Sequence, residues 1–317
     1  MYGNFAAGKR LSHFADPASV YQILDEIRGR HGKSYQALLN HLVGEISKYH
    51  LNLSDGEKKS KHKPKLIIGL SGGIDSTVVT YLAARAVGPE NVLPITMPAR
   101  EDEVESLHNA ELVRSNLGID EQDFPFVIPI GDIIKEQIET INGLGYGDIT
   151  IETSSLAQSL DDKIRLGNFA ARTRIAIMYD LARQLNGRVL GAGNKTEFVQ
   201  GFAAKYGTPF SCDYNVLHEL YKVDVFELAN LLNVPKNIID STPTTGYYQG
   251  QTHEAELRAS LEEQDALAFL LFEKQVDAKS IIWKYRVNPD FVELMISRYE
   301  RSLHKRMLQQ DYIKIEY

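Results

Sequence analysis

The hydrophobic pattern of this chain alternates between short apolar runs and stretches of helical periodicity. Apolar runs of four or five residues predict strands at 66–70, 92–96, 125–129 and 188–191. Apolar residues at helical spacing predict helices between them, at 74–87, 102–117, 131–141 and 160–185. Strands that alternate with helices indicate a parallel sheet with right-handed crossovers. We therefore predict an α/β fold in which a doubly wound parallel sheet carries helices on both faces.

Both ends of the chain are predicted to be helical. Two helices are expected over residues 17–49, broken near Gly32, with Asp16 as the N-cap and Pro17 in the first helical position. A charged stretch, SDGEKKSKHKP at 54–64, follows as a linker. Helices in the C-terminal third are predicted at 223–232, 254–273, 277–285 and 289–306. The predicted organisation is an N-terminal helical segment with its linker over 1–64, and a main domain with a helical C-terminal part over 65–317.

The first strand, a glycine turn and the next helix together predict a site for phosphate. Ser71-Gly72-Gly73 separates the apolar run from the helix that begins at Ile74. A helix start leaves backbone N–H groups unpaired and carries partial positive charge, and paired glycines let phosphate oxygens approach the main chain. Neither a G-x-G-x-x-G fingerprint nor a Gly-Lys-Ser/Thr ending is present. The alternative is an ordinary turn, because Gly-Gly also precedes helices that bind nothing.

Carboxylates near this turn point to a metal ion. Asp75 would repel phosphate unless Mg²⁺ bridged the two, since hard cations take carboxylate and phosphate oxygens together. Glu197 follows the last predicted strand, close to a helix start, and the carboxyl ends of parallel strands meet at one edge of a sheet. We therefore expect Asp75 and Glu197 to hold Mg²⁺ on a triphosphate, with Lys205 offsetting charge on the departing pyrophosphate. Alternatively, Glu197 only complements the helix dipole.

Composition narrows the function classes. The 317 residues are 43% hydrophobic and 24% charged, which is typical of a globular protein, and the net charge of −7 argues against a general nucleic-acid binder. The single cysteine, Cys212, provides no disulfide framework and suggests a reducing compartment. No apolar run reaches the roughly 18 residues of a membrane helix, and the N-terminus lacks a signal-peptide apolar core. We expect a cytoplasmic protein without nucleic-acid or membrane partners.

The motif SGGxDS at 71–76 resembles the pyrophosphate loop of the ATP pyrophosphatases, enzymes that split ATP between the α- and β-phosphates. Seven further motifs occur in the order and approximate spacing of NAD synthetase: GNFAARTRI (167–175), GNKTEF (193–198), KYG (205–207), LYK (220–222), PTTG (243–246), GQTHEAEL (250–257) and LHKR (303–306). The chain resembles the ammonia-dependent form, because the 65 residues before the first strand are too few for the N-terminal glutaminase of the longer form. The resemblance implies an adenine nucleotide alpha hydrolase-like fold.

The resemblance also implies an activity and a set of site residues. Ammonia would amidate the nicotinate carboxylate of deamido-NAD through an acyl-adenylate, giving NAD, AMP and pyrophosphate. The positions expected to bind ATP are Gly69, Leu70, Ser71, Gly72, Gly73, Ile74, Asp75, Ser76, Lys222 and Thr244. The positions expected to bind the substrate are Arg172, Lys205, Asp213, His304 and Lys305. Asp75 and Glu197 would bind Mg²⁺, the protein would form a homodimer, and a separate glutaminase could supply the ammonia.

Three departures from the family pattern leave the second substrate open. Ala192 and Ala204 stand where the family usually has threonine, and Thr208 stands where it usually has aspartate. Each lost hydrogen bond to a charged group is worth about 1.5–3 kcal/mol, enough to change which carboxylate is accepted. The alternatives are therefore a paralogue that amidates a different carboxylate, another SGGxDS enzyme, or a non-catalytic nucleotide sensor that binds ATP without releasing pyrophosphate.

Overall fold

The centre of the molecule is a four-stranded parallel sheet. The computed structural model describes residues 13–30, 34–56, 64–119, 126–145, 159–241 and 259–306. The strands are β1 (Leu66–Gly69), β2 (Val92–Ile95), β3 (Arg188–Gly191) and β4 (Tyr214–Asn215), in the order β2-β1-β3-β4. Leu66 of β1 lies opposite Val92 on one side and Arg188 on the other. The apolar residues of the central strand are buried, as expected where helices cover both faces of a parallel sheet.

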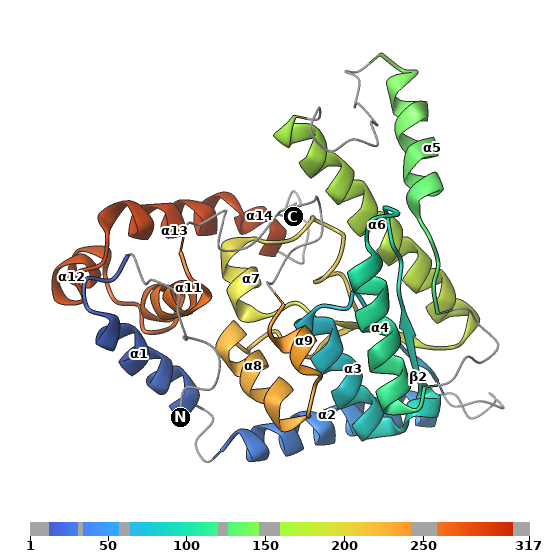
Figure 1. Cartoon of the computed structure of the whole chain (residues 1–317), viewed down its shortest axis with the longest axis horizontal. Coiled ribbons are helices and arrows are strands. Elements are labelled where there is room, and N and C mark those ends of the chain that lie inside the picture. Colours follow the sequence, from blue (N-terminus) through green and yellow to red (C-terminus); the bar gives the residue numbers. More distant parts are fainter. Residues whose placement is uncertain are drawn as a thin grey trace, which may run out of the picture.

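The strand order makes the sheet doubly wound, as predicted. The chain moves outward from β1 to β2 and then returns past β1 to β3, so right-handed crossovers place their helices on opposite faces. Both α3 (Ile74–Val87) and α6 (Leu160–Gln184) pack against β1. Between β2 and α6 the chain forms α4 (Val104–Leu117) and α5 (Gly131–Asn142). Figure 1 shows α5 and the adjoining part of α6 projecting from the body of the molecule.

A second core lies beside the sheet and joins the two ends of the chain (Figure 1). It contains α1 (Pro17–Gly29), α11 (Leu261–Ala268), α12 (Ala278–Lys284) and α13 (Pro289–Arg301), and reaches α7 (Lys195–Gln200) and α8 (Lys222–Leu231). The apolar stripe of α1 is buried here through Val20, Ile23, Leu24 and Ile27. By contrast, α2 (Tyr35–Gly56) packs on α3 and α8.

Helix ends were predicted well where a local signal marks them. Asp16 caps α1 by accepting the Ala18 N–H at 3.0 Å, and α4 ends at Gly118, whose φ is +63°. The helix predicted over 254–273 is different: α11 begins only at Leu261, because Ser260 caps it, and its last turn is a π-helix, η2 (Phe269–Glu273). Residues 254–258 lie outside the described residues.

Other local differences have simple causes. Within the described residues, the strand predicted at 125–129 is a single parallel bridge between Thr96 and Val127. Its flanking prolines have no N–H to give to a ladder. Ser302 separates α13 from α14 (Leu303–Arg306), and the sequence did not predict the two-residue β4 or α9 (Lys236–Ile239). No helix in the described ranges has the length and apolar character needed to cross a membrane.

Candidate active site

The predicted phosphate loop, residues 69–76, runs from the end of β1 into α3 and is closed by its own hydroxyl groups. The Ser71 and Ser76 hydroxyls lie 3.0 Å apart, and the Ser76 hydroxyl accepts the Ser71 N–H at 3.2 Å and donates to the Gly73 carbonyl at 3.1 Å. Gly72 has a φ of +77°, and a Cβ there would lie 2.4 Å from the Ser106 carbonyl oxygen. Only glycine therefore fits at 72, and the loop keeps its backbone against α4.

Asp75, in the first turn of α3, is the point where three separate segments meet. Its Oδ2 accepts a hydrogen bond from Nζ of Lys222, the first residue of α8, whose side chain is only 3% exposed. Its Oδ1 accepts from Nδ2 of Asn194, in the turn after β3, at 2.9 Å. The resemblance assigned Lys222 to ATP, and that role stays a prediction; in the structure its ammonium contacts Asp75. The carboxylate is thus fixed by a buried cation and an amide.

Glu197 shares the same asparagine. Asn194 caps α7: its Oδ1 accepts the Glu197 N–H at 2.9 Å, while the Glu197 carboxylate accepts the Asn194 N–H at 3.3 Å. Glu197 therefore lies in the first turn of α7, where its charge complements the helix dipole, as the alternative interpretation of the sequence stated. This does not exclude a second role for Glu197 as a metal ligand. Burial and the negative charge of Asp75 raise the pKa of Glu197 to about 8, and Lys222 opposes this shift. The two predicted carboxylates consequently interact in one site.

Asn194 is a site residue that sequence reasoning missed. The signal was present, because Asn-x-x-Glu directly before a helix is a capping box. A capping box predicts the bonds within α7. It does not predict that the amide also donates to Asp75, which comes from another part of the chain.

A cavity of about 540 Å³ opens beside these groups, a size suited to a small ligand. It is bounded by the phosphate loop and by the carboxyl ends of β2 and β3. Four carboxylates line it: Asp75, Glu103, Glu105 and Glu197. Among the described lining residues Arg174 is the one cation; its Nε donates to the Met97 carbonyl at 3.1 Å and its Nη2 lies 3.9 Å from Glu103. Because carboxylates outnumber cations among these lining residues, a triphosphate would need added cations to bind here.

The five predicted substrate residues do not line this cavity. Arg172 and Lys205 lie together, since Arg172 Nε donates to the Lys205 carbonyl at 3.1 Å. The Lys205 ammonium lies 5.2 Å from the centre of the Tyr206 ring. Asp213 accepts the Val189 N–H at 2.8 Å, which ties it to the start of β3. The roles assigned to these three side chains stay predictions.

The two C-terminal substrate residues lie near the end of α7. His304 Nδ1 is 3.0 Å from the Arg301 carbonyl, and Lys305 Nζ donates to the Gly201 carbonyl at 2.9 Å. Gly201 directly follows α7, the helix that carries Glu197. The C-terminal helix is thus attached to the far end of the helix that presents the second carboxylate. Thr244, the remaining predicted ATP residue, lies outside the described residues.

The doubly wound sheet, the glycine loop and the paired carboxylates beside a cavity of small-ligand size are the features of an α/β protein of the nucleotide-binding class. The model of the NAD synthase family matches residues 46–309. The chain therefore belongs to the NAD synthetase family, ligases that use ATP to amidate deamido-NAD to NAD.

Individual relatives agree with the family match. An NH(3)-dependent NAD(+) synthetase from Thermococcus kodakarensis is 39% identical over 242 residues, covering 76% of this chain and 86% of that protein. Its counterpart from Pyrococcus furiosus is 35% identical over 250 residues, covering 79% and 88%. Among solved structures, an NMN synthetase from Francisella tularensis superposes with a TM-score of 0.64 at 27% identity, covering 86% of this chain and 98% of that one.

Proposed function

We propose that this chain amidates the nicotinate carboxylate of deamido-NAD with ammonia, consuming ATP and releasing AMP and pyrophosphate. The observation that carries the proposal is the meeting of Asp75 and Glu197 beside the Ser71-Gly72-Gly73 turn, at one edge of the sheet. A turn that serves only to connect a strand and a helix requires no second carboxylate from a distant segment. The family match supports the same chemistry.

The donor set at this edge suits Mg²⁺. Asp75 and Glu197 offer hard oxygen ligands. Burial and the negative charge of Asp75 raise the pKa of Glu197, and a bound cation would relieve the repulsion between the two carboxylates. When bound, Mg²⁺ would neutralise charge on the leaving pyrophosphate, a contribution of several kcal/mol. The Lys222 ammonium on Asp75 supplies a second positive charge in the same place.

The chain's own residues account for binding and orientation. The N–H groups at the start of α3 have no acceptors within the helix and would bind the β- and γ-phosphates of ATP. A carboxylate oxygen of the substrate attacks the α-phosphorus, and the bond to the bridging oxygen breaks to release pyrophosphate. Ammonia then attacks the acyl carbon, the bond to AMP breaks, and the nitrogen loses a proton. No protein nucleophile is needed, so the protein contributes positioning and electrostatics.

The acyl-adenylate must be kept from water. We infer that the segment 203–214 acts as a lid, because Thr208, Pro209, Ser211 and Cys212 from it line the cavity. A second candidate lid, the segment 143–158, lies mostly outside the described residues.

We further infer a cytoplasmic homodimer that receives ammonia directly or from a separate glutaminase. In the family the dinucleotide is expected near the subunit interface. The positions of Arg172, Lys205, Asp213, His304 and Lys305 away from the single-chain cavity support this arrangement. A partner subunit would then complete the substrate site.

One observation favours a second candidate, the amidation of a smaller carboxylate. The chain resembles an NMN synthetase as well as NAD synthetases, and Ala192, Ala204 and Thr208 remove polar groups that the family usually has. Nicotinate mononucleotide is therefore the alternative substrate, by the same adenylation chemistry.

The experiment compares both carboxylates with one enzyme preparation. Purified protein, MgATP and an ammonium salt are combined with deamido-NAD or with nicotinate mononucleotide, and AMP and the amide product are quantified together. We expect AMP and NAD in equal amounts, with kcat/KM at least tenfold higher for deamido-NAD. A tenfold preference for the mononucleotide would establish the alternative. If no AMP were released with either carboxylate, both candidate functions would be excluded.

A further inference from the structure

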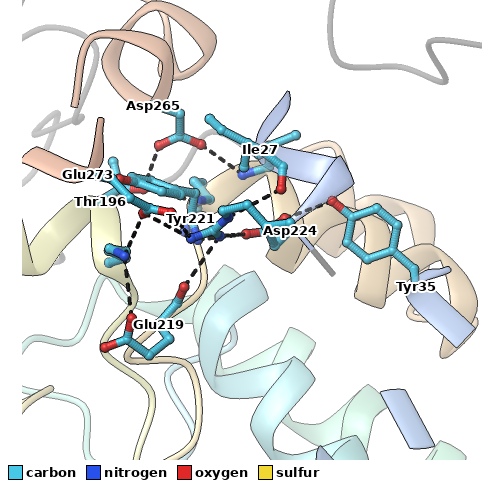
Figure 2. Close-up of polar contacts among 12 residues, drawn as sticks. Ile27, Tyr35, Thr196, Glu219, Tyr221, Asp224, Asp265 and Glu273 are labelled. Atoms are coloured by element: carbon cyan, nitrogen blue, oxygen red, sulfur yellow. Dashed lines mark hydrogen bonds and ion pairs between the residues drawn. The ribbon is translucent and has the colours of Figure 1, made fainter. Parts of the chain in front are cut away.

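Helix α1 and the first part of α2 lie outside the stretch that matches the family model, residues 46–309. Polar groups from these helices nevertheless reach the interior (Figure 2). Arg30, at the C-terminal end of α1, donates from Nη2 to Asp224 Oδ2 at 3.0 Å and from Nη1 to both carboxylate oxygens of Glu273 at 3.0 Å. The Tyr35 hydroxyl, at the start of α2, donates to Asp224 Oδ1 at 2.7 Å. One guanidinium therefore joins two carboxylates from different elements.

The first of these carboxylates leads to Lys222. Asp224 is the third residue of α8 and caps that helix, because its Oδ2 also accepts the Tyr221 N–H at 2.9 Å. Its side chain is fully buried. Lys222, the first residue of the same helix, is the cation on Asp75. Arg30 and Tyr35 thus hold the group that fixes the start of α8.

The second carboxylate leads to Glu197. Glu273 accepts from Lys195 Nζ at 2.7 Å, and Lys195 is the first residue of α7. Lys195 follows Asn194 and precedes Glu197 by two positions. The Tyr221 ring lies close to both cations, 4.9 Å from the Arg30 guanidinium carbon and 5.3 Å from the Lys195 ammonium. Figure 2 shows Glu273 and Asp224 close to Tyr221, with Tyr35 on the far side of Asp224.

We propose that Arg30 is a positioning residue for the nucleotide site, because it fixes the starts of α7 and α8 relative to each other. Through them it sets where Glu197 and Lys222 lie around Asp75. The guanidinium of Arg30 uses separate nitrogens for the two carboxylates, Nη2 for Asp224 and Nη1 for Glu273, so the single nitrogen of a lysine is a poor substitute. The inference rests on the proposed function in one respect, that MgATP binds at Asp75 and Glu197. A displacement of about 1 Å in such groups can cost about a hundredfold in rate.

The test measures the affinity for MgATP by calorimetry in variants at Arg30 and at a matched position. Arg28→Met is the control, because Arg28 is an arginine of the same helix that also pairs with α8, through Glu227 at 3.2 Å. We expect Arg30→Met to weaken the affinity for MgATP about tenfold and Arg30→Lys to have an affinity between those of Arg30→Met and the wild type. The affinity of Arg28→Met should stay within twofold of wild type. Tyr35→Phe, which removes one hydroxyl and keeps the packing, should weaken binding about threefold and serves if Arg30→Met does not fold.

A double-mutant cycle separates positioning from general stability. In a Glu197→Gln background, the Arg30 substitutions should lose at least half of their effect on MgATP affinity, because the group they position has already been changed. Equal effects in both backgrounds, or affinity within twofold of wild type for Arg30→Met, would overturn the inference. MgATP binding needs no second substrate. If the cycle shows coupling between Arg30 and Glu197 but neither carboxylate substrate is amidated, only the proposed function fails. If a substrate is amidated but Arg30 and Glu197 are not coupled, only the role of Arg30 fails.

Discussion

Two regions border the cavity, and they are held in different ways. The phosphate loop closes on itself, and its Ser71–Ser76 contact spans five residues. The second region, where α7 and α8 begin, contributes Glu197 to the cavity and is held by contacts between distant segments. Lys222 and Asp75 are 147 residues apart in the chain, and Asn194 and Asp75 are 119 apart. The loop is therefore determined by local sequence, while the placement of Glu197 and Lys222 depends on the whole fold.

The second core supports this distant region through one buried aspartate. Asp265 of α11 accepts the Thr196 hydroxyl at 2.5 Å and the Val223 N–H at 2.9 Å. Thr196 in turn accepts the Lys222 N–H at 2.9 Å. A helix that touches neither the cavity nor the loop thus holds the first residues of both α7 and α8. The comparison teaches that substitutions far from the cavity can disturb the carboxylate pair while the loop stays intact.

The largest effect is expected at the point where the two regions meet. Asp75→Ala should lower AMP release about a thousandfold, since several kcal/mol of electrostatic stabilisation are lost. It should also lower the free energy of unfolding by about 3–5 kcal/mol, because Lys222 is left buried without its carboxylate. The double variant Asp75→Ala/Lys222→Met should recover most of the stability and none of the activity. Activity within tenfold of wild type would show that Asp75 has no role in the reaction.

A smaller effect is expected from a substitution that disturbs the phosphate loop alone. Gly72→Ala forces a positive φ on alanine and brings Cβ against the Ser106 carbonyl, so the loop must shift at a cost of about 1–3 kcal/mol. We expect MgATP affinity to fall about ten- to a hundredfold. Gly73→Ala is the matched comparison: Gly73 has a φ of −84°, and the nearest atom to a Cβ there is the Ser71 hydroxyl at 3.4 Å, so this variant narrows the space for phosphate oxygens without straining the loop. Equal losses in the two variants would mean that loop geometry does not govern binding.

The same contrast explains what the sequence could predict. The loop, the helix from Ile74 and the caps at Asp16 and Gly118 follow from neighbouring residues, and the structure confirms them. The apolar runs likewise predicted β1, β2 and β3, because buried parallel strands are nearly continuous apolar segments. Local pattern alone left Glu197 as a helix-dipole residue, and its position after the last predicted strand, taken together with the SGGxDS turn, predicted that it would lie with Asp75.

The remaining contacts had no local signal. The buried polar residues of α11 interrupt an apolar pattern, and nothing near Asp265 in the chain shows that its partners are Thr196 and Val223. Lys222 resembles an ordinary first-turn lysine until α8 is packed against α3. Such residues become predictable only when the relative placement of the helices is known.

The mildest prediction tests the distant region through pH. Burial raises the pKa of Asp265 to about 7, above the value near 3.9 of an unfolded aspartate. Between pH 4 and 7 the unfolded chain therefore releases a proton that the folded chain keeps, and the free energy of unfolding falls as pH rises. Urea titrations at pH 5 and pH 7.5 measure how far the free energy of unfolding decreases between the two pH values. This decrease should be about 2 kcal/mol larger for wild type than for Asp265→Asn.

The control for this titration is Asp180→Asn. Asp180 is exposed on α6, so this variant makes the same change of side chain outside the buried cluster and should leave the pH dependence contributed by Asp265 in place. If Asp265→Asn also kept the wild-type pH dependence of the free energy of unfolding, Asp265 would be ionised in the folded protein at pH 5. The Thr196 and Val223 hydrogen bonds would then outweigh burial, and the link from α11 to the start of α8 would be a charged one, stronger than a neutral pair.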